Sequence, residues 1–207
     1  MVKEYAETPI SRHLILELLN DYQSPNDKIS ELLKSKELIS LRRGLYITGP
    51  KMELPIPEPF LIANHLRGPS YVSLESALSY WNMIPERVYE ISSVTIKTSK
   101  LYKTQAGRFS YRQLKTPYYS YGIKSIAYSP KQTILVASPE KALCDKVVLT
   151  SKIYLRSIKQ TREFLMEDLR MDSGILKTLD TKVMEFWIKN APKKSSLKML
   201  IKTLIEL

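Results

Sequence analysis

The stretch Val94-Thr-Ile-Lys-Thr-Ser99 alternates apolar or β-branched side chains with more polar ones, residue by residue. Alternation with a period of two is typical of a β-strand. Further strand-like runs lie at residues 109–111, 123–128 and 133–137, and short turn sequences separate them. Because short turns join antiparallel neighbours, residues 91–137 are predicted to form an antiparallel sheet.

The same region is basic and contains no acidic residue. Between residues 91 and 139 there are eight Lys or Arg residues and no Asp or Glu, and seven aromatic residues are interleaved with them. Cations without acidic neighbours attract polyanions, and aromatic rings can stack on bases. The alternative is a basic sheet whose tyrosines simply pack its own faces. The cations predicted to contact DNA phosphates here are Lys97, Lys100, Lys103, Arg108, Arg112 and Lys115.

Residues 1–50 are predicted to form a separate small unit. Ser11 can cap a helix over residues 11–22, and Ser24-Pro25 predicts a second helix that runs to about residue 36. Two strand-like runs flank Gly44 and predict a hairpin. Two helices followed by a hairpin with a basic turn outline a winged helix-turn-helix, whose wing leans on the phosphate backbone. The residues predicted to contact DNA in this unit are Lys28, Lys34, Lys36, Arg42 and Arg43.

The proline-rich residues 49–59 mark the predicted domain boundary, since closely spaced prolines favour extended backbone. The second domain, residues 51–207, is predicted to mix helices with the antiparallel sheet to about residue 150 and to be helical over residues 151–207. The predicted fold class is therefore α+β. Residues 1–50 carry seven basic and seven acidic residues, so the rest of the chain holds the whole net charge of +11. Helices in this domain are predicted over residues 60–66, 73–81, 138–149, 157–169, 178–190 and 195–206.

The sequence shows no residue pattern typical of an enzyme. His13 and His65 lie on separate predicted helices, without Cys, His or carboxylate partners at metal-ligand spacing. The six glycines form no phosphate-binding loop. Glu140 and Asp145 raise the alternative of a metal-dependent nuclease, but they fall on a predicted helix, where Lys141 and Asp145 have ordinary ion-pair spacing. We therefore predict a non-catalytic protein without metal or cofactor.

The sequence also predicts a cytoplasmic protein without a membrane partner. Its apolar runs are far too short to span a bilayer, and its first residues lack the apolar core of a signal peptide. The single cysteine, Cys144, excludes an internal disulfide and fits a reducing compartment. Because it lies on a predicted helix without a nearby histidine, Cys144 is expected to be a buried thiol, not a nucleophile.

Three motifs follow one another along the chain: Leu41-Arg-Arg-Gly-Leu-Tyr-Ile47, Tyr71-Val-Ser-Leu-Glu-Ser-Ala-Leu78 and Ser138-Pro-Glu-Lys-Ala-Leu-Cys-Asp145. With these motifs, the chain resembles the AbiEi family of antitoxin-type transcriptional regulators. That family belongs to bacterial type IV toxin–antitoxin systems of abortive infection, a form of phage defence. The resemblance places Tyr46 in the wing and adds it to the predicted DNA contacts. Family members have three helices before the wing where this chain has two, so a shortened winged helix is expected.

The resemblance implies a DNA-binding transcriptional repressor and antitoxin without catalytic activity. Its winged helix would bind double-stranded DNA at an operator upstream of its own operon. Its C-terminal part would help to bind DNA and would counteract a nucleotidyltransferase-like toxin encoded next to it. The residues of the second and third motifs are expected to act structurally, as helix caps and in packing. The alternative is a protein-interaction module whose basic sheet binds an acidic partner, with little or no sequence-specific DNA binding.

Overall fold

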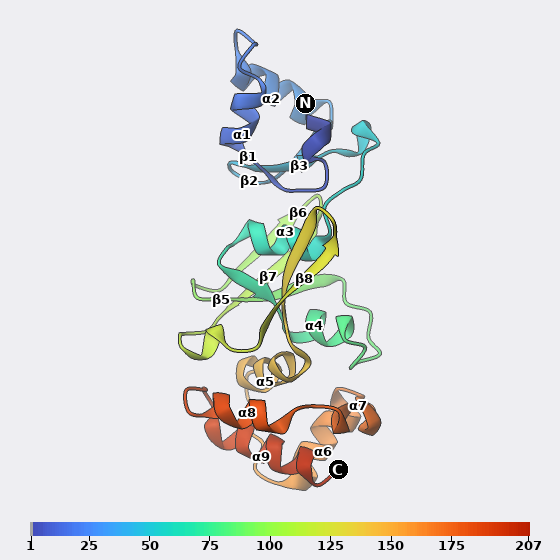
Figure 1. The fold of residues 1–207 in the computed structure, drawn as a ribbon, viewed down its shortest axis with the longest axis vertical. Coiled ribbons are helices and arrows are strands. Elements are labelled where there is room, and N and C mark those ends of the chain that lie inside the picture. The colour runs from blue at the N-terminus through green and yellow to red at the C-terminus, as the bar shows by residue number, and fades with distance from the viewer. Residues whose placement is uncertain (1) are drawn as a thin grey trace.

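The computed structural model describes residues 2–207, which form an elongated α+β molecule with three parts along its long axis (Figure 1). A small N-terminal unit lies at one end, a six-stranded sheet with its helices lies in the middle, and a helical part lies at the other end. The two ends of the chain are therefore far apart. Within the described residues, no helix combines the length and hydrophobicity that crossing a membrane requires.

The N-terminal unit consists of a three-stranded antiparallel sheet and two helices around a small core of its own. Ser11 caps α1 by accepting a hydrogen bond from the backbone N–H of Leu14 at 3.2 Å, as the sequence predicts. Pro25 is the first residue of α2, but Ser24 makes no side-chain capping bond. The core consists of Ile10, Ile15, Leu19, Ile29, Leu38 and Tyr46. The elements are a 3-10 turn (Val2–Tyr5), β1 (Ile10–Ser11), α1 (Arg12–Leu18), α2 (Pro25–Lys34), β2 (Leu38–Arg42) and β3 (Leu45–Thr48), with the strand order β1-β3-β2.

The middle of the chain forms a mixed sheet, so the prediction of an antiparallel sheet is wrong in part. β5 and β7 pair in parallel, because β6 turns back and occupies the edge beyond β7. β4 and β9 also pair in parallel, at Val72 and Val136. β4 has only three residues, all of them buried, so its sequence shows no alternation. The strands are β4 (Ser70–Val72), β5 (Glu90–Thr95), β6 (Lys100–Thr104), β7 (Gly107–Gln113), β8 (Ile123–Ser129) and β9 (Gln132–Ala137), in the order β6-β7-β5-β4-β9-β8.

Helices cover both faces of this sheet. Ser70 and Tyr71 are neighbours on β4 and point to opposite faces. The Ser70 hydroxyl donates to the carbonyl of Ala63 in α3, whereas Tyr71 donates to Asp145 in α5 at 2.9 Å. One face is therefore covered by α3. The other face is covered by α5 and by α4, which packs against α5. The helical elements here are a 3-10 turn (Pro50–Met52), α3 (Pro59–Leu66), α4 (Leu74–Tyr80), a 3-10 turn (Tyr118–Ser120) and α5 (Pro139–Leu149).

The C-terminal part is helical, and a lysine connects it to α5. Lys193 donates from Nζ to the carbonyls of Val147, Thr150 and Ile153, at 3.1, 2.6 and 3.0 Å. These carbonyls lie at or just beyond the C-terminal end of α5, where the helix dipole favours a cation. The elements are α6 (Ile158–Glu163), a π-helical turn (Phe164–Asp168), α7 (Ser173–Lys177), α8 (Thr181–Ile188) and α9 (Lys194–Ile205).

A fully buried ion pair lies where α5 meets β4. Lys141 Nζ is 2.7 Å from Asp145 Oδ1, and both side chains are 0% exposed. Tyr71 and Ser73 donate their hydroxyl hydrogens to Asp145 Oδ2 at 2.9 and 2.8 Å, and Lys141 also donates to the carbonyl of Tyr118 at 3.1 Å. Both carboxylate oxygens thus have partners, which offsets the cost of removing the two charges from water.

Replacing Asp145 with Ala should lower the free energy of unfolding by about 3–5 kcal/mol, because the charge of Lys141 then stays buried without a partner. Urea unfolding followed by circular dichroism measures the change. The double variant Lys141→Met/Asp145→Leu removes both charges and should recover most of the lost stability. A loss below about 1 kcal/mol for Asp145→Ala would show that the pair matters little.

Candidate nucleic-acid interface

Three arginines gather around the turn between β2 and β3. Gly44 has a φ of +79°, which favours glycine and allows the chain to turn directly after Arg42 and Arg43. The backbone N–H of Arg12 donates to the carbonyl of Gly44 at 3.0 Å, so α1 begins beside this turn. Arg12 also donates from Nη2 to Asn26 Oδ1 at 2.6 Å. Arg12 therefore connects the hairpin turn to the first turn of α2.

Arginine side chains also bind backbone carbonyls where the N-terminal unit meets the sheet. Arg42 donates from Nε to the carbonyl of Leu66, the last residue of α3, at 2.9 Å. Arg67 donates from Nη2 to the carbonyl and hydroxyl oxygens of Thr98 at 2.7 and 3.0 Å, and from Nη1 to the hydroxyl of Tyr102 at 3.4 Å. These bonds hold together the end of β2, the end of α3 and the turn before β6.

Five cations belong to the segments that meet at this contact, and we call them the basic junction. It consists of Arg42, Arg43, Arg67, Lys97 and Lys100. Lys97 donates from Nζ to the carbonyl of Gly68, next to Arg67, and Lys100 Nζ lies 4.8 Å from the centre of the Tyr102 ring. None of the ion pairs formed within residues 2–207 involves any of the five. Their charge is therefore not neutralised by the described part of the chain.

The buried Tyr111 lies within electrostatic range of this charge. Its hydroxyl donates to the carbonyl of Ala63 at 2.7 Å. Burial and, to a smaller extent, Tyr102 raise the pKa of Tyr111, whereas the guanidinium groups of Arg67 and Arg42 act in the opposite direction. The two arginines come from different units of the molecule and yet act on the same side chain.

The basic residues of the sheet do not form one surface. Paired residues on neighbouring strands point to the same face, and successive residues along a strand point to opposite faces. Lys100 pairs with Tyr111 and lies on the face of α3, whereas Lys103 pairs with Arg108 and lies with Arg112 on the face of α4 and α5. The cations of the sheet that are predicted to contact DNA therefore cannot all face one duplex, because the alternation that identifies the strands also separates their cations.

On the face of α4 and α5, Arg108 and Arg112 have acidic neighbours. Arg108 forms an ion pair with Glu90 at 3.2 Å. Arg112 lines a cleft of about 720 Å³ and lies near Glu75, which pairs with Lys146. The charge of Arg108 is therefore offset by the protein itself and that of Arg112 in part, so this face is a weaker candidate for binding phosphates.

The remaining residues predicted to contact DNA differ in their exposure and in whether they already have an acidic partner. Lys34, Lys36 and Lys115 are exposed. Lys28 is partly buried and already pairs with a glutamate of the same helix at 2.8 Å. Tyr46 is only 8% exposed and packs in the core of the N-terminal unit, so its predicted contact with DNA does not fit the structure.

Most of the interleaved aromatic residues pack inside the protein. Phe109, Tyr111, Tyr118 and Tyr119 are buried, and Tyr102 is partly buried with its ring edge against Tyr111. For these residues the alternative interpretation holds, in which the tyrosines pack the sheet. They offer no flat surface on which bases could stack.

Arg12 and Arg67 are not among the residues predicted to contact DNA, although both contribute to this surface. Each stands at the end of a helix: Arg12 directly after the capping Ser11, and Arg67 directly before Gly68-Pro69. Such positions let a long side chain reach a neighbouring part of the molecule. Which part it reaches depends on contacts between residues far apart in the sequence, and no local pattern specifies these.

The third motif holds no metal site. The described residues contain no group of His, Cys and carboxylate side chains that could hold an ion. Asp145 is occupied by the buried ion pair, and Glu140 accepts a hydrogen bond from the Ser138 hydroxyl at 2.8 Å at the start of α5. Cys144 is 2% exposed, and burial raises the pKa of its thiol. These residues stabilise α5 and the core around it.

The fold is similar to that of a solved structure. The crystal structure of the RV2827C protein from Mycobacterium tuberculosis matches with a TM-score of 0.63, over 98% of this chain and 75% of that chain. The two sequences are 12% identical, so the similarity concerns the fold. No protein-family model matches the sequence, and no curated protein matches it either.

Replacing Arg67 with Ala should loosen the contact between the end of α3 and the turn before β6, because three hydrogen bonds to Thr98 and Tyr102 are lost. We expect the free energy of unfolding to fall by about 1–3 kcal/mol, and the amides near Thr98 to exchange faster. Arg67→Lys keeps the charge but cannot bridge both partners, and should restore only part of the stability. Arg156→Ala, at an exposed arginine of the helical C-terminal part, is the control. Equal effects of Arg67→Ala and Arg156→Ala would argue against a special role of Arg67.

Proposed function

We propose that the protein is a DNA-binding transcriptional repressor with an N-terminal winged helix-turn-helix. The order of elements supports this: β1, then α1 and α2, then the hairpin β2–β3, whose second strand pairs with β1. The 3-10 turn Val2–Tyr5 stands where a first helix would lie, which is consistent with a shortened unit. In this arrangement α2 is the candidate recognition helix, and the turn at Gly44 is the candidate wing tip.

The unneutralised charge of the basic junction is the main support for DNA binding. Arg42 and Arg43 belong both to the wing and to the junction, and so extend the positive surface from the N-terminal unit to the turn between β5 and β6. A duplex supplies a regular row of phosphates, and neutralising them releases counterions into solution. Although residues 1–50 are neutral in sum, Lys97 and Lys100 of the sheet add charge beside the wing.

The three sequence motifs support the narrower proposal of an AbiEi-type antitoxin. The first motif forms the wing turn and β3, the second forms β4 and α4, and the third forms the start of α5. Tyr71 and Ser73 of the second motif donate hydrogen bonds to Asp145 of the third. On this proposal, the protein binds an operator upstream of its own operon in the cytoplasm. It counteracts an adjacently encoded nucleotidyltransferase-like toxin without catalysis of its own.

The wild-type protein should bind duplex DNA from upstream of its own gene, with an affinity that falls steeply as salt is added. The double variant Arg43→Ala/Lys100→Ala should weaken binding to all duplexes and lower the slope of log affinity against log salt by about one for each residue replaced. Neither side chain donates a hydrogen bond within the described residues, so the fold should be unaffected. Fluorescence anisotropy at several salt concentrations measures both quantities.

The control is Lys177→Ala/Lys182→Ala, which removes the same charge from α7 and α8 at the far end of the molecule. This variant should bind DNA as the wild type does, with an unchanged salt slope. Equal losses in the two double variants would mean that only net charge matters. Absence of salt-dependent binding by the wild type would rule out the repressor proposal.

The antitoxin part has its own test. Expression of the adjacent nucleotidyltransferase-like gene that the proposal requires should arrest bacterial growth, and co-expression of this protein should restore it. Cell density after induction is the measurement, with an empty vector as the control. Persistent arrest in the presence of a well-expressed, DNA-binding protein would exclude the antitoxin role and leave the repressor role intact.

A further inference from the structure

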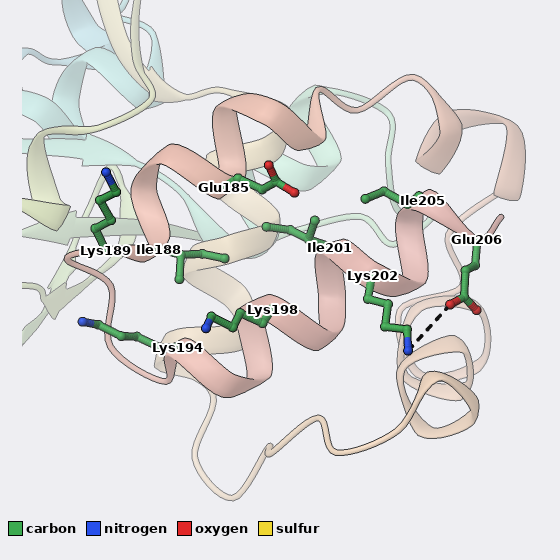
Figure 2. Close-up of a pocket in the computed structure, with 9 residues that line it drawn as sticks. All are labelled: Glu185, Ile188, Lys189, Lys194, Lys198, Ile201, Lys202, Ile205 and Glu206. Carbon is green, nitrogen blue, oxygen red and sulfur yellow. Dashed lines mark ion pairs between the residues drawn. The ribbon is translucent and has the colours of Figure 1, made fainter.

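A groove between α8 and α9 lies at the opposite end of the molecule from the N-terminal unit (Figure 1). Its volume is about 590 Å³. Figure 2 shows Ile188 of α8 and Ile201 of α9 facing each other across it. Both are buried at its floor, whereas Ile205, one helical turn further along α9, is 64% exposed. Apolar surface that is accessible in this way is typical of a binding groove.

Four lysines surround this apolar floor, and α9 supplies three of them. Lys194, Lys198 and Lys202 follow one another at intervals of four residues, so they lie along one side of the helix. Lys189 extends from the end of α8 (Figure 2). All four are exposed, and within residues 2–207 only Lys202 has an acidic partner, Glu206 at 4.0 Å.

This row of lysines is unfavourable for α9 by itself. Like charges four residues apart on a helix repel each other and destabilise it, and here two such pairs occur in succession. A negatively charged partner would relieve the repulsion. Apolar side chains from that partner would at the same time remove the exposed surface of Ile205 from water.

We propose that the groove between α8 and α9 binds an acidic amphipathic helix of a partner protein. A helix with apolar side chains at helical spacing fills such a groove, and acidic residues along its edges would meet the lysine rim. The four lysines outnumber the two glutamates of the groove, Glu185 and Glu206. This surface is separate from the basic junction, and its function does not depend on DNA binding.

Two other occupants fit the groove less well. DNA phosphates would neutralise the lysines but would leave the exposed side chain of Ile205 without an apolar contact. A second copy of this chain would bring a like net charge of +11, which opposes association through a positive face. The combination of an apolar floor and a basic rim therefore favours an acidic amphipathic segment.

Nuclear magnetic resonance titration of the isotope-labelled full-length chain tests this proposal. The probe is a synthetic peptide of roughly 18 residues, five helical turns, with leucines on one face and glutamates on the other. One comparison peptide has the same composition without an apolar face, and another has lysine in place of glutamate. The amphipathic acidic peptide should shift amide signals of α8 and α9 and bind about tenfold more tightly than either comparison peptide.

Variants of the protein complete the test. Lys194→Glu/Lys198→Glu should weaken binding of the acidic peptide about tenfold or more, because the rim then repels it. Lys177→Glu/Lys182→Glu makes the same change of charge outside the groove and should leave the affinity unchanged. Equal binding of the three peptides, equal effects of the two double variants, or shifts centred on the basic junction would each overturn the proposal. Tighter binding of duplex DNA at α8 and α9 would assign the groove to nucleic acid instead.

Discussion

Hydrogen bonds from two arginine side chains arrange the surface proposed to bind DNA: one joins the N-terminal unit to α3, and the others join the end of α3 to the turn before β6. Arg42 binds the end of α3, and Arg67 continues the contact to the turn before β6. Leu41, Leu45 and Ile47 support the same arrangement by packing into the main core. Because hydrogen bonds from a charged donor are stronger than neutral ones, the Arg42 bond together with this packing can fix the orientation of the N-terminal unit. Cations from distant parts of the sequence are thereby brought together.

The protein uses charged residues in two contrasting ways. Lys141 and Asp145 are paired, hydrogen-bonded and completely buried, so they serve the fold. The cations of the basic junction form no ion pair within the described residues, and all of them except the half-buried Arg67 are exposed to an anionic ligand. The third motif contains most of the residues that first suggest catalysis. Because its charges are paired and buried, it is better understood as the structural centre of the sheet and α5.

Local signals in the sequence predicted the helices well and the sheet only in part. Ser138-Pro139 at the start of α5 and Ser11 at the start of α1 act as the sequence indicated, because capping depends on neighbours within a few residues. The three-residue β4 was not predicted, since both of its faces are buried and it shows no alternation. Without β4, the parallel pairing of β4 with β9 could not be foreseen.

The same limit applies to the candidate site. The sequence identified the basic region. It did not show to which face of the sheet each cation points, or how that face lies relative to the N-terminal unit. Tyr46 belongs to β3, where all four residues are buried because both faces of that strand are covered. Arg12 and Arg67 gain their importance from the pairing of β1 with β3 and from the contact at β6, which are properties of the three-dimensional fold.

The positive surface that spans both units can be tested directly by photo-crosslinking. A photoreactive residue would be placed singly at positions 43, 97 and 108 of the full-length protein, bound to duplex DNA from upstream of its gene. If the basic junction binds the phosphate backbone, positions 43 and 97 should both crosslink to DNA, and position 108, on the opposite face of the sheet, should not. Crosslinks mainly from position 108, or equal crosslinks from all three, would contradict a DNA-binding surface at the junction.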